Sequence, residues 1–228
     1  MTRNNNVVDE LWEAAARCFP DLSPEDQQIG LALLRELGRG EPVAVSQFAQ
    51  ALRTSIERAS ALVKDSVLSP FIHTDEAGRI QGFMGLAVIR THHQLTVNGR
   101  TLWTWCAYDT LFIPELLGET AAIETRDPET GQLIRLTVSP AGVEAADPAG
   151  ILASIVRPEA WDVSSASQVM ASACHFMFFF ASRTSGERWQ VKHQETVLVS
   201  LDEALALAKR SNAHLFGAEL ARWRGSAM

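Results

Sequence analysis

The chain has 228 residues, of which 46% are hydrophobic and 21% charged, and its formal net charge is −7 at pH 7. This composition is typical of a globular protein with a sizeable core and excludes an intrinsically disordered chain. The acidic balance argues against nucleic acid as a partner, because binding phosphate requires a basic patch. Residues 1–6 are polar and no apolar run reaches roughly 18 residues. We therefore expect no signal peptide, no membrane partner and a cytoplasmic location.

Residues 1–80 have the patterns of a small helical region. Apolar residues at helical spacing predict a first helix over residues 7–18 and a second from Ser23, as N-cap, to about Gly38. Ser46 is expected to cap a third, short helix, and a fourth follows over residues 56–67. Most of the secondary structure in this region is therefore expected to be helical.

A hairpin over residues 71–80 is expected to follow these helices, with its turn near residues 76–78. Helices followed by a hairpin are the order of a winged helix-turn-helix, whose third helix enters a DNA groove. The charges of the corresponding helix here, residues 55–66, cancel: Arg58, Lys64, Glu57 and Asp65. We therefore favour a structural or substrate-covering role for this region over DNA binding.

Strand patterns dominate from residue 81, beginning with a Gly-rich apolar stretch over residues 81–89. Hairpins are expected over residues 94–103, around the strong turn signal Asn98–Gly99, and over 121–138. Further strands are expected over residues 151–156, 172–182 and 196–200, and a terminal helix over residues 201–223. The expected fold class is α+β, with a helical, winged-helix-like domain (1–80) followed by a mixed-sheet domain with flanking helices (81–228).

Three cysteines are present, an odd number that does not suggest a disulfide framework in a chain without a signal peptide. Cys18 lies in an ordinary helical pattern, where a small buried residue is the expected role. Cys106 and Asp109 share one face if the chain turns helical after Trp105. If Cys174 meets them in space, two thiols and a carboxyl form one cluster, although spacing alone does not bring them together. The sequence lacks the tight ligand pairs of a structural zinc site.

Four segments together resemble the organomercurial (alkylmercury) lyases: Trp103–Leu111, Leu136–Pro140, Asp147–Gly150 and Cys174–Ser182. Trp189 and residues 192–194 continue the match. That family cleaves carbon–mercury bonds to a hydrocarbon and mercuric ion. The resemblance implies that Cys106, Asp109 and Cys174 are catalytic and hold the mercury. It implies no cofactor, with Hg(II) bound as the product, and a winged-helix-like region before a mixed-sheet core.

The resemblance also implies an organomercurial substrate, and small thiols or a mercuric reductase as the acceptor of Hg(II). Some relatives carry further cysteines where this chain has Asp127 and His175. Because the three reacting residues are complete, we expect this difference to affect stability or mercury handling and not the reaction.

The residues themselves support this chemistry, because thiolates are the natural ligands of a soft ion such as mercury. In the expected reaction, thiolates of Cys106 and Cys174 attack the mercury while Asp109 accepts a thiol proton and then donates it to carbon. An aromatic wall, formed by Trp103, Trp105 and residues 178–180, would raise the pKa of Asp109. Two alternatives stay open: a mercury- or thiol-responsive winged-helix DNA-binding regulator, and a mercury-binding protein without catalysis.

Overall fold

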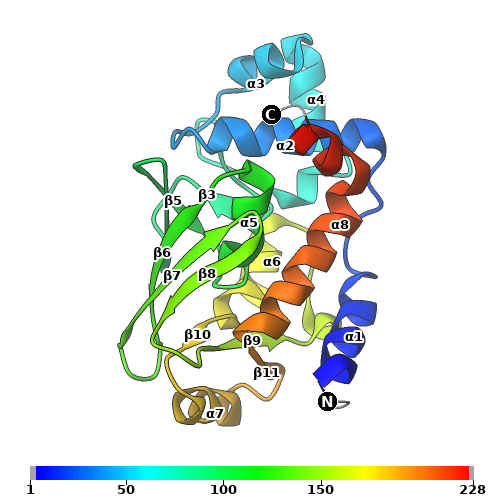
Figure 1. Ribbon diagram of the computed structural model, residues 1–228. Helices are drawn as coiled ribbons and strands as arrows, with labels where there is room; N and C mark the ends of the chain where they lie inside the picture. The colour runs from blue at the N-terminus through cyan, green and yellow to red at the C-terminus, as the bar shows by residue number, and fades with distance from the viewer. Residues whose placement is uncertain (1–3, 226–228) are drawn as a thin grey trace.

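The structure, a computed structural model, describes residues 4–225 and has the expected α+β architecture (Figure 1). The α-helices are α1 (Asn4–Ala15), α2 (Pro24–Leu37), α3 (Val45–Leu52), α4 (Ile56–Asp65), α5 (Asp109–Leu117), α6 (Ala166–Ser172), α7 (Arg183–Lys192) and α8 (Leu201–Gly225). Short 3₁₀ turns are η1 (Ser69–Phe71), η2 (Pro158–Ala160) and η3 (Cys174–Phe176).

The strands form two sheets. They are β1 (Ile72–Thr74), β2 (Ile80–Phe83), β3 (Leu86–Ala87), β4 (His93–Val97), β5 (Arg100–Thr104), β6 (Ala121–Arg126), β7 (Leu133–Ser139), β8 (Gly142–Asp147), β9 (Leu152–Val156), β10 (Phe179–Phe180) and β11 (Thr196–Ser200). The larger sheet has the order β1-β2-β3-β5-β4-β6-β7-β8, and the smaller has the order β10-β9-β11.

Every strand pair in the described part of the chain is antiparallel, so the expectation of a mixed sheet is wrong. Short turns connect most neighbouring strands, and such turns permit only antiparallel pairing. The turn between β4 and β5 is the predicted one, since Asn98 and Gly99 both have positive φ (49° and 75°). This is the backbone that a tight two-residue hairpin requires.

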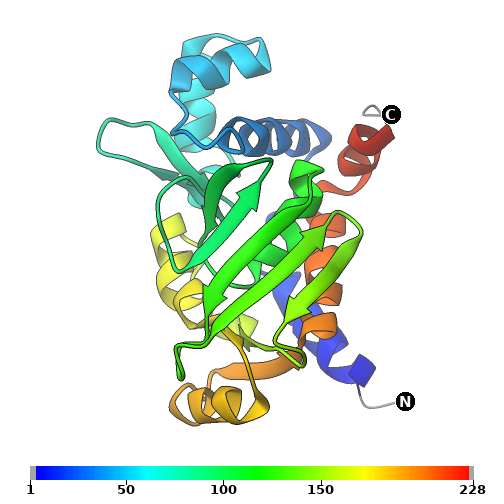
Figure 2. The ribbon, with the colours of Figure 1, turned by 60° about the vertical axis from the view of Figure 1, so that its left-hand side comes forward.

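The larger sheet buries one face and exposes the other. Residues of β6 alternate between buried and exposed along the whole strand. Helices α5 and α8 lie behind the sheet in the view of Figure 2, on its covered side, and α8 also packs against α1 and α2. The chain's last helix is therefore in contact with both the sheet layer and the N-terminal helices.

The N-terminal helices largely follow the sequence prediction. Ser23 caps α2 as expected: its Oγ accepts the N–H of Asp26 at 3.2 Å and its own N–H donates to the Asp26 carboxylate at 3.1 Å. Helix α3 instead begins one residue before Ser46, with Ala44 as an N-cap that makes no side-chain hydrogen bond. The prediction that Ser46 caps this helix is wrong, because Ser46 already lies within its first turn.

The predicted strand over residues 172–182 is also wrong. Helix α6 ends at Ser172, η3 follows, and only Phe179 and Phe180 pair with β9. A short apolar run without alternation signals burial and does not distinguish a strand from a buried turn. Strand β8 and helix α7 were not predicted, while the terminal helix was, although Gly217 (φ 23°, ψ −109°) interrupts it.

The structure is continuous across residue 80. Strand β1 pairs with β2 in the larger sheet, and Val43 forms an isolated bridge to Ile80. One hydrophobic core cluster includes side chains from both sides of this position, from Leu33 and Phe48 to Leu136 and Phe216. None of the helices within residues 4–225 combines the length and apolar character needed to cross a bilayer.

Candidate active site

Cys106 and Asp109 lie where strand β5 gives way to helix α5, as the sequence predicts. The backbone of this joint is held by two hydrogen bonds: Trp105 N–H donates to the Gly85 carbonyl at 2.8 Å, and Thr104 Oγ1 donates to the Cys106 carbonyl at 2.8 Å. Asp109 is the first residue of α5, and its Oδ2 accepts the Cys106 N–H at 2.8 Å. The joint therefore fixes the carboxylate beside the cysteine.

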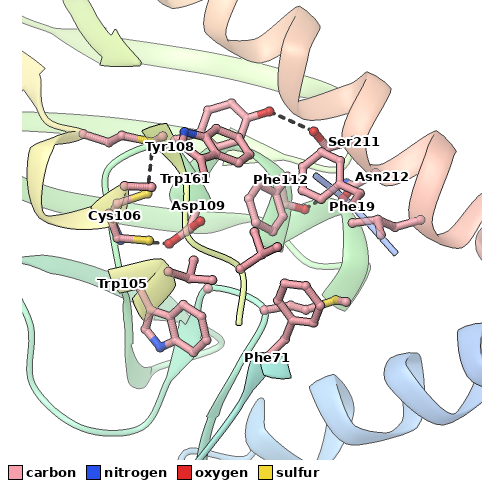
Figure 3. Close-up of a pocket in the computed structure, with 18 of the residues that line it drawn as sticks. Phe19, Phe71, Trp105, Cys106, Tyr108, Asp109, Phe112, Trp161, Ser211 and Asn212 are labelled. Carbon is pink, nitrogen blue, oxygen red and sulfur yellow. Dashed lines mark hydrogen bonds between the residues drawn. The ribbon is translucent and has the colours of Figure 1, made fainter. Parts of the chain in front are cut away.

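Cys174 reaches the same place from η3, directly after helix α6. The Ala107 N–H donates to the Met177 carbonyl at 3.1 Å, and the Met177 N–H donates to the Cys174 carbonyl at 3.2 Å. These bonds join the two loops through their backbones. The two sulfurs and a carboxylate oxygen of Asp109 all lie within 4.8 Å of one another. Figure 3 shows Cys106 and Asp109 directed toward each other at the edge of a pocket.

Gly85 makes room for the Asp109 carboxylate. Its φ is +89°, a conformation that L residues rarely adopt, and a Cβ built on it would lie 2.5 Å from Asp109 Cγ. The same Cβ would lie 2.7 and 2.9 Å from the two carboxylate oxygens. The loop between β2 and β3 therefore admits no side chain at this point without moving Asp109.

Burial controls the proton affinity of the cluster. Cys106 is 1% exposed, and Cys174 and Asp109 are each 6% exposed. Burial raises the pKa of Asp109 to about 7, although the Cys106 N–H opposes this shift by stabilising the carboxylate. A carboxyl with such a pKa exists in both forms near neutral pH. It can therefore accept and donate a proton under the same conditions.

Both thiols hold their protons more tightly than a free cysteine. Burial raises the pKa of Cys106 well above its usual value, and its hydrogen bond to Cys174 and the nearby Asp109 add to this shift. The same hydrogen bond lowers the pKa of Cys174, but burial and Asp109 outweigh it and the net shift is upward. The free site therefore contains thiols, which become thiolates when a soft ion displaces their protons.

A cavity of about 90 Å³ opens beside the cluster, and its wall is mainly apolar. Aromatic side chains form much of this wall: Phe19, Phe71, Trp105, Tyr108, Phe112, Trp161 and Phe216. Trp105 lines the cavity as predicted. The prediction was wrong for Trp103 and Phe178, which line a separate groove, and for Phe179 and Phe180, which are fully buried away from the cavity.

Helix α8 closes one side of the cavity, a contribution that the sequence did not reveal. Tyr108 Oη and Ser211 Oγ are hydrogen-bonded at 3.0 Å, as Figure 3 shows. Asn212 Nδ2 donates to the Phe112 carbonyl at 3.1 Å and to Glu115 Oε2 at 2.6 Å. These contacts fasten α8 to α5 next to the cluster. No local pattern could have indicated them, because the partners are about a hundred residues apart in the chain.

The remaining residues singled out by sequence lie outside the cluster. Cys18 is half-buried and its Sγ lies 3.5 Å from the Pro158 carbonyl. His175 is exposed and does not line the cavity. Asp127 is 1% exposed, and its Oδ2 accepts the Ala181 N–H at 2.9 Å. Asp127 therefore has a structural role, linking the β6–β7 turn to the segment that follows β10.

Comparison with known proteins places this arrangement in a family. The family description "Alkylmercury lyase" matches residues 86–212. A relative named alkylmercury lyase from Staphylococcus epidermidis is 32% identical over 181 residues, covering 79% of this chain and 80% of that protein. One from Pseudomonas putida is 36% identical over 177 residues, covering 78% of this chain and 79% of the relative.

A solved structure supports the fold. The crystal structure described as the mercury-bound form of MerB2 superposes with a TM-score of 0.74, at 22% identity, over 91% of this chain and 99% of that one. The family match spans both loops that form the cluster, and the named relatives cover most of the chain. The chain therefore belongs to the alkylmercury lyase family.

Proposed function

We propose that this alkylmercury lyase cleaves the carbon–mercury bond of alkyl and aryl mercury compounds through Cys106, Cys174 and Asp109. The observation that carries the proposal is the cluster itself: two thiols and one carboxyl, mutually within 4.8 Å, at the edge of an apolar cavity. Sulfur is the preferred ligand of a soft metal, and the aromatic wall suits an apolar organic group. The products are a hydrocarbon and Hg(II).

In the first stage, a cysteine sulfur attacks the mercury of the substrate. Each thiol must lose its proton as its sulfur–mercury bond forms, and Asp109, with a pKa of about 7, is positioned to accept one. Two metal–thiolate bonds of about 2.3 Å, the length found for zinc, can span sulfurs that lie within 4.8 Å of each other. One mercury can therefore bind both cysteines while it still carries its organic group.

In the second stage, two sulfur donors place electron density on the carbon bound to mercury, and Asp109 protonates that carbon as the bond breaks. The protons balance: one of the two thiol protons passes through Asp109 to the hydrocarbon, and the other leaves with the ligand displaced from mercury. Hg(II) stays on Cys106 and Cys174. Burial helps the protonation step, because it favours the neutral, proton-donating form of Asp109.

Benzene release from phenylmercury in the presence of excess small thiol tests the assignment. Cys106→Ser and Cys174→Ala are each expected to abolish benzene formation, measured by gas chromatography. Cys18→Ser is the matched control and should turn over like the parent enzyme, because Cys18 does not line the cavity. Equal turnover in all three variants would refute the catalytic roles. Tight mercury binding by the parent chain without benzene would favour a mercury-binding protein instead.

We further propose that residues 1–80 are a winged-helix-like region that covers the site and does not bind DNA. Its order supports this: helices α2, α3 and α4 precede the β1–β2 hairpin, and Phe19 and Phe71 contribute to the cavity wall. On α4, the Arg58 guanidinium lies 3.6 Å from the Glu25 carboxylate in an ion pair, which offsets its positive charge. A winged-helix regulator would retard duplex DNA with strong salt dependence, and we expect no retardation here.

We propose small cellular thiols or a mercuric reductase as acceptors of the bound Hg(II), within the reducing cytoplasm. The chemistry supports this class of acceptor, because only another sulfur donor competes well for a thiolate-bound soft ion.

A further inference from the structure

A third sulfur atom lies against the cysteine pair. The Sγ of Cys106 lies 3.9 Å from Sδ of Met177, within the range of a weak sulfur–sulfur hydrogen bond. Met177 is 3% exposed and lines the same cavity as the two cysteines. Its side chain is part of the hydrophobic core, and its sulfur faces that of Cys106.

The position of Met177 is fixed by both cysteine loops. Its N–H donates to the Cys174 carbonyl, and its carbonyl accepts the Ala107 N–H. Its backbone therefore moves with the cluster, while the three rotatable bonds of its side chain allow the sulfur to adjust by a small amount. An ion bonded to Cys106 comes within reach of this sulfur without rearrangement of the backbone.

We propose that Met177 is a third ligand to Hg(II), supplying a thioether lone pair to the ion held by Cys106 and Cys174. This deepens the proposed function and rests on it. Coordination by a thioether forms one sulfur–mercury bond and releases no proton, because the sulfur carries none.

A neutral ligand suits this site. Two thiolates already balance the charge of Hg(II), and a third thiolate would add an uncompensated negative charge to a buried, mainly apolar cavity, which is costly. A thioether adds a soft donor without adding charge. The neighbouring His175 is exposed and cannot take this place, and Asp109 offers only hard oxygen atoms.

Mercury L3-edge X-ray absorption distinguishes this ligand from the cysteines if the enzyme is labelled with selenomethionine. Labelling converts the Met177 sulfur to selenium and leaves both cysteine sulfurs unchanged. The labelled protein is loaded with one equivalent of mercuric chloride. We expect two sulfur neighbours and one selenium neighbour around mercury, with the selenium signal lost in Met177→Leu. Leucine is close to methionine in volume and apolar, so the packing is largely kept.

Two control variants locate the signal. Met84 also lines the cavity, and Met170 is half-buried and does not line it. Met84→Leu and Met170→Leu should both keep the selenium neighbour. Its absence from the labelled parent protein, or its loss in Met84→Leu and not in Met177→Leu, would overturn the role of Met177. Two sulfurs without selenium would leave the proposed function intact, whereas a mercury without cysteine sulfurs would refute the proposed function itself.

The third ligand should also slow the departure of Hg(II). We expect Met177→Leu to transfer bound Hg(II) to excess dithiol about tenfold faster, the lower end of what losing a supporting contact costs a metal site. Met170→Leu should match the parent rate. Equal transfer rates in all three proteins would contradict a ligand role for Met177.

Discussion

At the scale of single residues, the site depends on one carboxyl group kept in an unusual state. Asp109 is buried, which favours its neutral form, and accepts a backbone N–H, which favours its charged form. The balance leaves its pKa at about 7, and the absence of a side chain at Gly85 leaves space for it. Both the position and the protonation of this one side chain are therefore set by its immediate surroundings.

Replacing Gly85 by alanine should move the carboxylate. The new Cβ would lie 2.5 Å from Asp109 Cγ in a backbone with φ +89°, so we expect at least a hundredfold loss of benzene release. The matched control is Gly78→Ala, with a similar φ of +75° but nothing within 4 Å. Both variants carry backbone strain of about 1–3 kcal/mol, measured by urea unfolding. A similar loss of turnover in both would show that strain, and not displacement of Asp109, is responsible.

The raised pKa of Asp109 should lower stability as pH increases. The unfolded chain ionises this group near pH 4 and the folded protein only near pH 7, so folding becomes less favourable through this range. The full penalty above pH 7 is on the order of 4 kcal/mol. Asp109→Asn keeps an oxygen for the Cys106 N–H but removes the group that ionises and that donates the proton to carbon. It should therefore abolish turnover and increase the free energy of unfolding.

Urea unfolding of Asp109→Asn and the parent enzyme at pH 5 and pH 8 measures this effect. The advantage of the variant should be small at pH 5 and larger at pH 8, because the parent carries more of the ionisation penalty at the higher pH. An advantage that is the same at both values would show that Asp109 does not titrate between them.

At the scale of elements, the sequence predicts best where one local rule decides the outcome. Asn98–Gly99 specifies its turn, Ser23 caps α2, and Cys106 lies at the predicted end of a strand. The prediction failed where packing decides the outcome. The segment after Cys174 is apolar because several elements cover it, and only two of its residues join a strand.

The cavity wall shows the same limit. That Cys106, Asp109 and Cys174 form one cluster could be predicted, because the family's motif is local at Cys106 and Asp109 and distinctive at Cys174. Tertiary packing alone brings Phe19, Trp161 and the residues of α8 to the same cavity. Their spacing in the sequence does not predict that they line it together.

Asp127 allows a test of how elements are joined. Its Oδ1 accepts the N–H groups of Glu129 and Thr130, and its Oδ2 accepts that of Ala181. Asp127→Ala should lower the free energy of unfolding by about 2 kcal/mol, because the buried N–H of Ala181 and two partly buried N–H groups of the turn lose their partner. Asp75 accepts the N–H groups of Ala77 and Arg79 in an exposed turn, where water can replace it. Asp75→Ala should therefore cost less, and an equal cost by urea unfolding would contradict the linking role of Asp127.

At the scale of the whole molecule, the site is assembled from both ends of the chain. Phe19 and Phe71 come from the N-terminal region, and Phe216 comes from the terminal helix. The larger sheet and the hydrophobic core both continue across residue 80. The helices before residue 80 and the strands and helices after it therefore share one interior.

This shared interior should make unfolding cooperative. We expect differential scanning calorimetry to show a single transition whose calorimetric and van't Hoff enthalpies agree. Cys18→Ser should melt the same way, since its thiol makes only weak contacts at the edge of the core. Two separate transitions would mean that residues 1–80 unfold as an independent unit.

The burial of Cys106 and Cys174 limits which molecules can reach their sulfurs. Thiols that are 1% and 6% exposed, beside a cavity of about 90 Å³, are less accessible to a large molecule such as a peptide thiol than to a small mercurial. The enzyme thus selects molecules by size before any bond is formed or broken. The same burial shields an ion bound to both sulfurs, so that any thiol that takes it over must first reach into the cavity.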